Sequence, residues 1–155
     1  MNNWKQELYS EINAIADVNA NPAELVIYIE GVKDFFSGTV EIFEFRRKMT
    51  VKAPVPVSVK LIDGSNVLSG DFTCTVDFMQ LKGAFSTQSG DPPLTINGVP
   101  KVLEDLRPVT ASGNWGLDPG DDRICIGGDE WQIVGVQGEK YLDGEPAIIR
   151  LTLRK

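Results

Sequence analysis

Residues 117–155 read LDPGDDRICIGGDEWQIVGVQGEKYLDGEPAIIRLTLRK, and this stretch decides the fold class of the chain. It contains three short apolar runs, at residues 123–126, 130–136 and 146–154, separated by segments rich in Gly and Asp. Apolar runs joined by Gly-Gly or Asp-Gly turns are typical of antiparallel hairpins. We therefore expect residues 117–155 to form a C-terminal three-stranded β-meander.

The length of the chain favours one domain spanning residues 1–155, because a single hydrophobic core can form at this size. No signal peptide opens the sequence, and no apolar run reaches the roughly 20 residues that a membrane helix needs. We therefore expect a protein that is cytoplasmic when made and that has no membrane partner.

Charge and residue content exclude several function classes. The formal net charge of −7 argues against a nucleic-acid-binding protein, because phosphate binding needs a basic surface. The chain has no histidine, which removes His-based catalytic triads and histidine metal sites.

The remaining reactive side chains have structural explanations. Cys74 and Cys125 lie in strand-like runs outside any CxxC motif, which favours small buried hydrophobic residues over a disulfide or a metal pair. Turn geometry explains the acidic cluster of the meander better than a cation site or an acid/base pair does. That cluster comprises Asp118, Asp121, Asp122, Asp129 and Glu130. We expect no catalytic residues, no metal site, no cofactor and no enzymatic activity.

The N-terminal part of the chain predicts a helix followed by strands. Trp4, Leu8 and Ile12 recur at helical spacing, which predicts an amphipathic helix at residues 3–17. Its apolar stripe would pack on the sheet or, as the second interpretation, dock on a partner. With strands expected between residues 23 and 80, the fold class is mainly β. We expect a small β-barrel or sandwich with this N-terminal α-helix.

The predicted strands differ in how they alternate. Residues 23–30 are apolar on both faces, which is typical of a strand covered on both sides. Residues 39–51 change register at Ile42-Phe43, which predicts either a β-bulge there or two partly buried faces. Residues 67–78 alternate cleanly and place Phe72, Cys74, Val76 and Phe78 on one core-facing side.

Several segments are candidates for contact with other molecules. Phe35 and Phe36 lie in a Gly-flanked loop at residues 31–38, as a core plug (the preferred interpretation) or an exposed contact. A basic cluster comprises Arg46, Arg47, Lys48 and Lys52. We interpret it as a solvated strand end in preference to a patch that anchors an acidic neighbour. Residues 81–116 look like an irregular loop or insertion, with a hairpin tip at Thr95–Gly98 and an exposed Trp115. The candidate interface residues are Trp4, Phe35, Phe36, Arg46, Arg47, Lys48 and Trp115.

The order of signals in the meander resembles a known family. Residues 119–136, PGDDRICIGGDEWQIVGV, followed by the strand IIRLTLRK at 148–155, are similar to the small head–tail connector (neck) proteins of tailed bacteriophages. These are the head-closure (stopper) proteins and the lambdoid head-to-tail joining proteins. Residues 63–72, with an Asp-Gly turn and a Gly-Asp before a strand, resemble the middle segment of that family.

The resemblance implies a virion structural protein that is made and assembled in the cytoplasm of the infected bacterium. It implies a homo-oligomeric ring between a portal or adaptor protein on the head side and tail proteins on the other. DNA would pass through the lumen of the ring. The alternatives are a tail terminator or minor tail protein, a small ligand-binding β-barrel module of cellular origin, and an enzyme that uses paired carboxylates.

Overall fold

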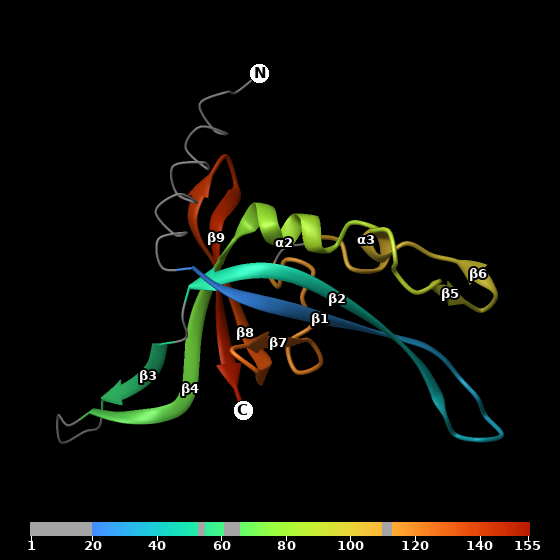
Figure 1. The fold of residues 1–155 in the computed structure, drawn as a ribbon, viewed down its shortest axis with the longest axis horizontal. Helices are drawn as coiled ribbons and strands as arrows, with labels where there is room; N and C mark the ends of the chain where they lie inside the picture. The colour runs from blue at the N-terminus through green and yellow to red at the C-terminus, as the bar shows by residue number, and fades with distance from the viewer. Residues whose placement is uncertain (1–19, 53–54, 61–65, 110–112) are drawn as a thin grey trace.

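The computed structural model describes residues 20–52, 55–60, 66–109 and 113–155, and the predicted helix at residues 3–17 lies outside these ranges. The described chain is mainly β, as predicted (Figure 1). Its elements are β1 (Ala20–Lys33), β2 (Val40–Lys52), β3 (Val55–Lys60), β4 (Asn66–Asp77), α2 (Phe78–Ala84), β5 (Thr95–Ile96), β6 (Val99–Pro100), α3 (Leu103–Leu106), β7 (Arg123–Ile126), β8 (Asp129–Leu142) and β9 (Glu145–Arg154).

Seven strands form one antiparallel sheet in the order β2-β1-β7-β8-β9-β4-β3. The sheet is open, with β2 at one edge and β3 at the other, whereas we expected closure into a barrel or two stacked sheets. It is nevertheless strongly curled, because β2 approaches β4 closely although β4 lies five places away in the strand order.

The C-terminal meander is confirmed, because β7, β8 and β9 are consecutive neighbours in the sheet. Gly127 and Gly128 form the two-residue turn between β7 and β8, with φ of 60° and 87°. The predicted end of the second strand at Val136 is wrong. β8 continues to Leu142, because the next turn is Asp143-Gly144 and the ladder with β9 extends up to it.

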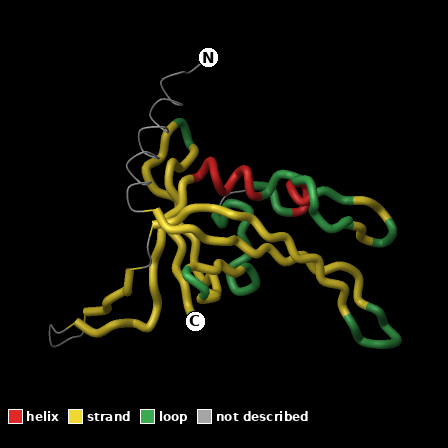
Figure 2. The backbone as a smooth tube through the Cα atoms, viewed as in Figure 1, coloured by secondary structure: helices red, strands yellow, loops and turns green. Residues whose placement is uncertain are grey.

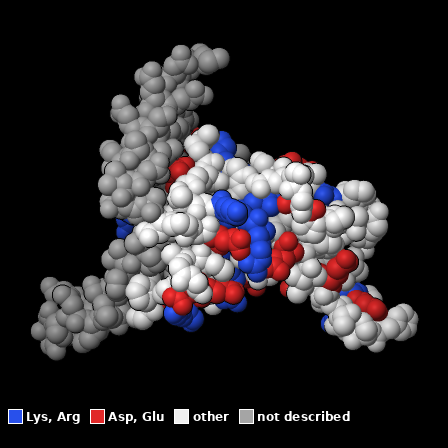
Figure 3. Space-filling model, viewed as in Figure 1, with Lys and Arg blue, Asp and Glu red and all other residues white. Residues whose placement is uncertain are grey.

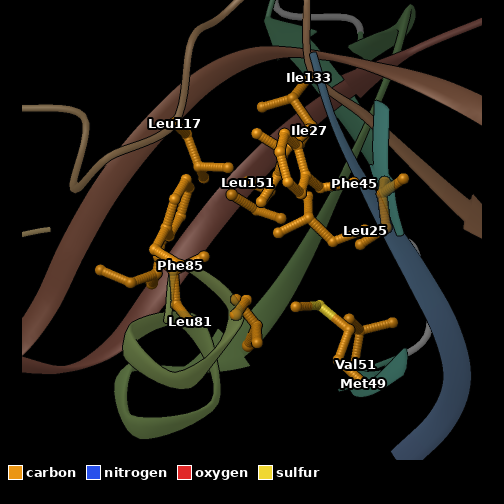
Figure 4. Close-up of a cluster of buried hydrophobic side chains, with 14 of the residues drawn as sticks. Leu25, Ile27, Phe45, Met49, Val51, Leu81, Phe85, Leu117, Ile133 and Leu151 are labelled. Carbon is orange, nitrogen blue, oxygen red and sulfur yellow. The ribbon is translucent and has the colours of Figure 1, made fainter. Parts of the chain in front are cut away.

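The core fills the concave side of the curled sheet (Figure 4). Leu25 and Ile27 of β1, Phe45 of β2 and Leu151 of β9 are almost fully buried there. The short helix α2 covers them with Leu81, and Phe85 follows directly after the helix. Val26 is also buried, on the opposite face of β1, which confirms that this strand is covered on both sides.

The register of β2 resolves the ambiguity at Ile42-Phe43. Alternate residues from Phe43 to Val51 face the core, whereas Ile42 is exposed. The irregularity lies on the partner strand, where the pairing shifts between Glu30 and Lys33. One extra residue of β1 at this point is a β-bulge. Neither interpretation of residues 39–51 was right, because β2 itself has no bulge at Ile42-Phe43 and its outer face, including Val40 and Ile42, is exposed.

The segment at residues 81–116 is more ordered than the sequence indicated. The chain leaves β4 and enters α2 at Phe78. Asp77 is the N-cap of this helix and accepts a hydrogen bond from the Gln80 N–H. The predicted hairpin tip is confirmed as β5 and β6 joined by Asn97-Gly98. One helical turn, α3, follows the hairpin and buries Leu103.

We predict that Gly128→Ala lowers the free energy of unfolding by about 1 kcal/mol, because an L-residue is strained at the positive φ of this position. No atom stands within 4 Å of the added Cβ, so the loss comes from the backbone alone. Gly83→Ala is the matched control. A Cβ added at Gly83 likewise has no atom within 4 Å, but this residue lies in α2 at an ordinary φ. The substitution should raise the free energy of unfolding by up to about 1 kcal/mol. Chemical denaturation of both variants measures the difference, and equal effects would contradict the argument.

Candidate interaction site

The β1–β2 hairpin extends away from the body of the protein as an arm (residues 29–43), clearly seen at the lower right of Figures 1 and 2. β1 pairs with β7 only from Ala23 to Val26, so beyond that point β2 is the only strand hydrogen-bonded to it among the described residues. The arm is therefore a two-stranded ribbon, and its end is the farthest part of the hairpin from the core.

The tip of the arm (residues 34–39) is a hydrogen-bonded turn. The Asp34 N–H donates to the Thr39 carbonyl at 2.8 Å, and the Gly38 N–H donates to the Asp34 carbonyl at 2.8 Å. The Asp34 carboxylate accepts from the Phe36 N–H at 2.9 Å, and this contact holds the pKa of Asp34 below its ordinary value. Gly38 has a φ of 73°, which suits glycine. The tip is thus held in one conformation by its own groups.

This turn presents two aromatic rings to solvent. Phe35 is 92% exposed and Phe36 is fully exposed, so the core-plug interpretation is wrong, and the contact with another molecule stays a prediction. Nine large hydrophobic side chains are exposed among the residues whose side chains are described, and five of them lie between residues 32 and 42. The outer end of the arm carries mainly uncharged atoms in Figure 3. Exposed apolar groups concentrated in this way are typical of interaction surfaces.

The basic cluster at residues 46–48 does not act as one unit. Arg47 is 4% exposed, and its guanidinium binds both carboxylate oxygens of Asp91, at 2.6 and 2.8 Å. It also donates to the Ala84 carbonyl at 2.8 Å. A solvated strand end was therefore the wrong interpretation for Arg47, which fastens the loop after α2 to β2. The alternation of the strand explains this outcome, because Arg46 and Lys48 point outward and Arg46 pairs with Glu24 and Glu44.

Two other candidate interface residues have different outcomes. Trp4 lies outside the described residues. Trp115 was expected to be exposed in its loop, but it is partly buried and packs edge-on against Phe78, with ring centroids 5.5 Å apart. It also lies 6.3 Å from the ring of Tyr141. Trp115 therefore closes one side of the core instead of forming a free contact surface.

The most constrained polar site is a pair that the sequence did not reveal, Arg107 and Asp122. Asp122 is fully buried, and its carboxylate is bonded to the Arg107 guanidinium. The same carboxylate accepts from the N–H of Asp118 at 2.8 Å and from the N–H of Tyr28 at 3.3 Å. Arg107 completes the set by donating to the Tyr28 carbonyl at 3.1 Å and to the Gly116 carbonyl at 2.7 Å.

This pair lies where β1 stops pairing with β7. Tyr28 lies two residues beyond Val26, the last residue of β1 that pairs with β7, and Asp122 directly precedes β7. The two side chains satisfy the Tyr28 N–H and carbonyl, which a neighbouring strand would otherwise bind. Burial raises the pKa of the Asp122 carboxyl, and the Arg107 charge offsets part of that rise.

An open groove lies beside this pair at the base of the arm. It has a volume of about 550 Å³ and is lined by Ile29, Ile42, Ile96 and Leu106 on its apolar part. Its polar lining comprises Tyr28, Glu30, Arg107, Asp118, Asp121, Arg123 and Glu130. The acidic residues at its rim include members of the turn cluster that the sequence singled out, which are therefore brought to one surface.

The described residues offer little for covalent or metal chemistry. Both cysteines are free, and burial raises the pKa of the Cys74 thiol to about 12, which keeps it protonated and unreactive at neutral pH. No group of acidic or cysteine side chains in the described part of the chain has the arrangement of a metal site. Within those residues there is also no helix long and apolar enough to cross a membrane.

We predict that Asp122→Asn lowers the free energy of unfolding by about 3 kcal/mol, because it leaves the part-buried Arg107 charge without its partner. Asp121→Asn, one residue earlier in the same turn and exposed, should change it by less than about 0.5 kcal/mol. Urea denaturation of both variants measures the contrast. A small loss for Asp122→Asn would show that the pair does not hold the turn in place.

The Arg47–Asp91 pair predicts a loss of stability in acid. Arg47 holds the pKa of the Asp91 carboxyl below its ordinary value of 3.8, so the pair stabilises the fold above that value. Its contribution disappears as the pH falls from about 3.8 through the lower pKa of the folded state. Asp91→Asn should lower the free energy of unfolding by about 3 kcal/mol at neutral pH and reduce its decline in acid.

The control for this prediction is Glu44→Gln, which removes an exposed partner of Arg46 and should cost less than about 1 kcal/mol. Melting temperatures measured between neutral pH and pH 3 give both slopes. An unchanged acid slope in Asp91→Asn would contradict the assignment.

No protein family model matches the sequence, and a search of curated proteins finds no significant match.

Proposed function

We propose that this chain is a structural protein of the head–tail interface of a tailed bacteriophage. It forms a ring that joins or closes the head and docks the tail. The observation that carries the proposal is the preformed arm tip with Phe35 and Phe36 exposed to solvent. Two adjacent phenyl rings on a fixed turn are costly to leave in water, and each would bury roughly 150–250 Å² in a contact. The arm therefore serves assembly with another protein surface.

The sequence resemblance supplies the class of assembly. The segments that resemble the phage neck proteins, residues 119–136 and 148–155, fold into β7, β8 and β9 as adjacent strands of one sheet. This arrangement supports the proposal because the similar segments form one structural unit instead of scattered turns. The partners proposed on this basis are a portal or adaptor protein on the head side and tail proteins on the other side.

The charge of the chain is compatible with DNA as a passing occupant of the ring lumen. A net charge of −7 repels phosphate, so a lumen lined by this protein would not retain the duplex. The proposed locations follow from this role. The protein is in the cytoplasm of the infected bacterium during assembly and in the neck or tail of the finished virion.

Deletion of the gene in the phage that encodes this chain tests the proposal. We expect DNA-filled heads and free tails that remain unjoined, with infectivity restored when the protein is supplied from a plasmid. Electron microscopy of the lysate distinguishes these particles. Intact tailed virions that lack the protein would refute the proposed role, and short or overlong tails on joined heads would indicate a tail terminator instead.

A ligand-binding β module is the second candidate, because the groove at the base of the arm has the volume of a small-molecule site. This function predicts a rise in melting temperature with a ligand, and the rise should be lost in Ile96→Arg, which fills the groove. A thermal-shift screen with metabolites and oligosaccharides tests it. No shift with any compound, together with ring formation, favours the first proposal.

A further inference from the structure

The tip of the arm and the groove at its base are complementary surfaces. The tip of a molecule cannot reach the groove of the same molecule. β1 and β2 are paired from Ile29↔Phe43 to Lys33↔Val40, so the strands between the groove and the tip are held at a fixed separation. The tip is also a hydrogen-bonded turn with no slack in its backbone. A tip that enters this groove must therefore come from another molecule.

The apolar parts of the two surfaces match. The groove offers Ile29, Ile42, Ile96 and Leu106 in an open volume of about 550 Å³, which suits the two phenyl rings of the tip. Ile42 is 59% exposed, so part of this lining is itself uncovered in the single chain. Contact would remove both apolar surfaces from water at once, which is the main favourable term in protein association.

One opposite charge beside the tip, that of Lys33, suits the acidic rim of the groove. The two arginines of the groove already have acidic partners: Arg107 pairs with Asp122, and Arg123 lies 3.8 Å from Glu130. The rim keeps Glu30, Asp118 and Asp121 as further acids, and burial together with Asp121 raises the pKa of the Asp118 carboxyl. Lys33, directly before the tip, is exposed and carries the opposite charge, whereas the Asp34 carboxylate of the tip is turned back onto the Phe36 N–H.

We propose that the arm tip of one copy docks into the groove of the next copy, with Phe35 and Phe36 on the apolar lining and Lys33 at the acidic rim. The contact joins two different surfaces of the chain, so it is head-to-tail and closes into a ring when its rotation allows. This inference rests on the proposed function for the closure of the ring. The tip alone is smaller than the roughly 1,200 Å² of a stable interface, so closure through several copies strengthens the assembly.

Two complementary variants of the full chain test the contact. The tip variant is Phe35→Ser with Phe36→Ser, and the groove variant is Ile96→Arg, which places a long cation where Lys33 and the rings would lie. Mass photometry and analytical ultracentrifugation should show a closed oligomer for the wild-type protein. Each variant should be monomeric on its own, because it lacks one half of every contact. An equal mixture should form a dimer of one copy of each variant at the high protein concentrations of analytical ultracentrifugation, since one intact tip and one intact groove remain and this single contact is weak.

Matched controls separate the contact from general surface effects. Val99→Arg lies on β6 of the same hairpin as Ile96, 51% exposed and outside the groove, and should assemble like the wild type. Met79→Ser removes an exposed apolar side chain of α2 and should also leave assembly unchanged. Circular dichroism and cooperative melting confirm that each variant is folded.

Several outcomes would overturn the proposal. These are a wild-type monomer at all concentrations, a folded tip or groove variant that assembles normally, or a mixture that stays monomeric at high concentration. Loss of assembly in Met79→Ser would place the receiving surface at α2 instead. The test is separate from that of the proposed function. If the protein is found in the virion neck and its tip variant still forms rings, the proposed function stands and the proposed contact is refuted.

Discussion

The ion pair between Arg107 and Asp122 is the constraint on which the rest of the architecture depends. It occupies the place of a neighbouring strand at Tyr28 and so fixes where β1 leaves the sheet. It also holds the turn from Asp118 to Asp122, which leads into β7. A buried pair of this kind adds little net stability over apolar packing, but removal of one partner lowers the free energy of unfolding strongly. Its main contribution is therefore geometric, because it separates the sheet from the arm and places one wall of the groove.

Side chains also take the place of strands at the other edge of the hairpin. The Gln80 amide accepts from the Thr50 N–H at 2.9 Å and donates to the Thr50 carbonyl at 3.1 Å. This contact blocks the edge of β2 near the core, where an unpaired strand would otherwise be open to association through its backbone. At this position the edge of β2 is therefore closed to pairing with another strand, which would otherwise compete with the proposed assembly through the tip.

The sequence predicted the elements that depend on local signals and missed those that depend on distant contacts. β7 was predicted with its observed bounds, because four alternating residues end at Gly127-Gly128. The second half of β8 was missed because its residues are mostly polar or glycine. The roles of Arg47 and Asp122 were also missed, because their partners lie 44 and 15 residues away and no periodic pattern connects them. Phe35 and Phe36 were found as candidates, but only the three-dimensional arm shows that they face solvent.

The wide separation of paired segments along the chain has a consequence for the order in which the protein forms during synthesis. The arm uses only residues 29–43 and their local pairing, so it can form as soon as this part has left the ribosome. The groove needs Ile96, Arg107 and Glu130, and β1 acquires its second neighbour only when residues 123–126 arrive. A growing chain therefore displays its two phenyl rings long before it has a surface that could receive another copy.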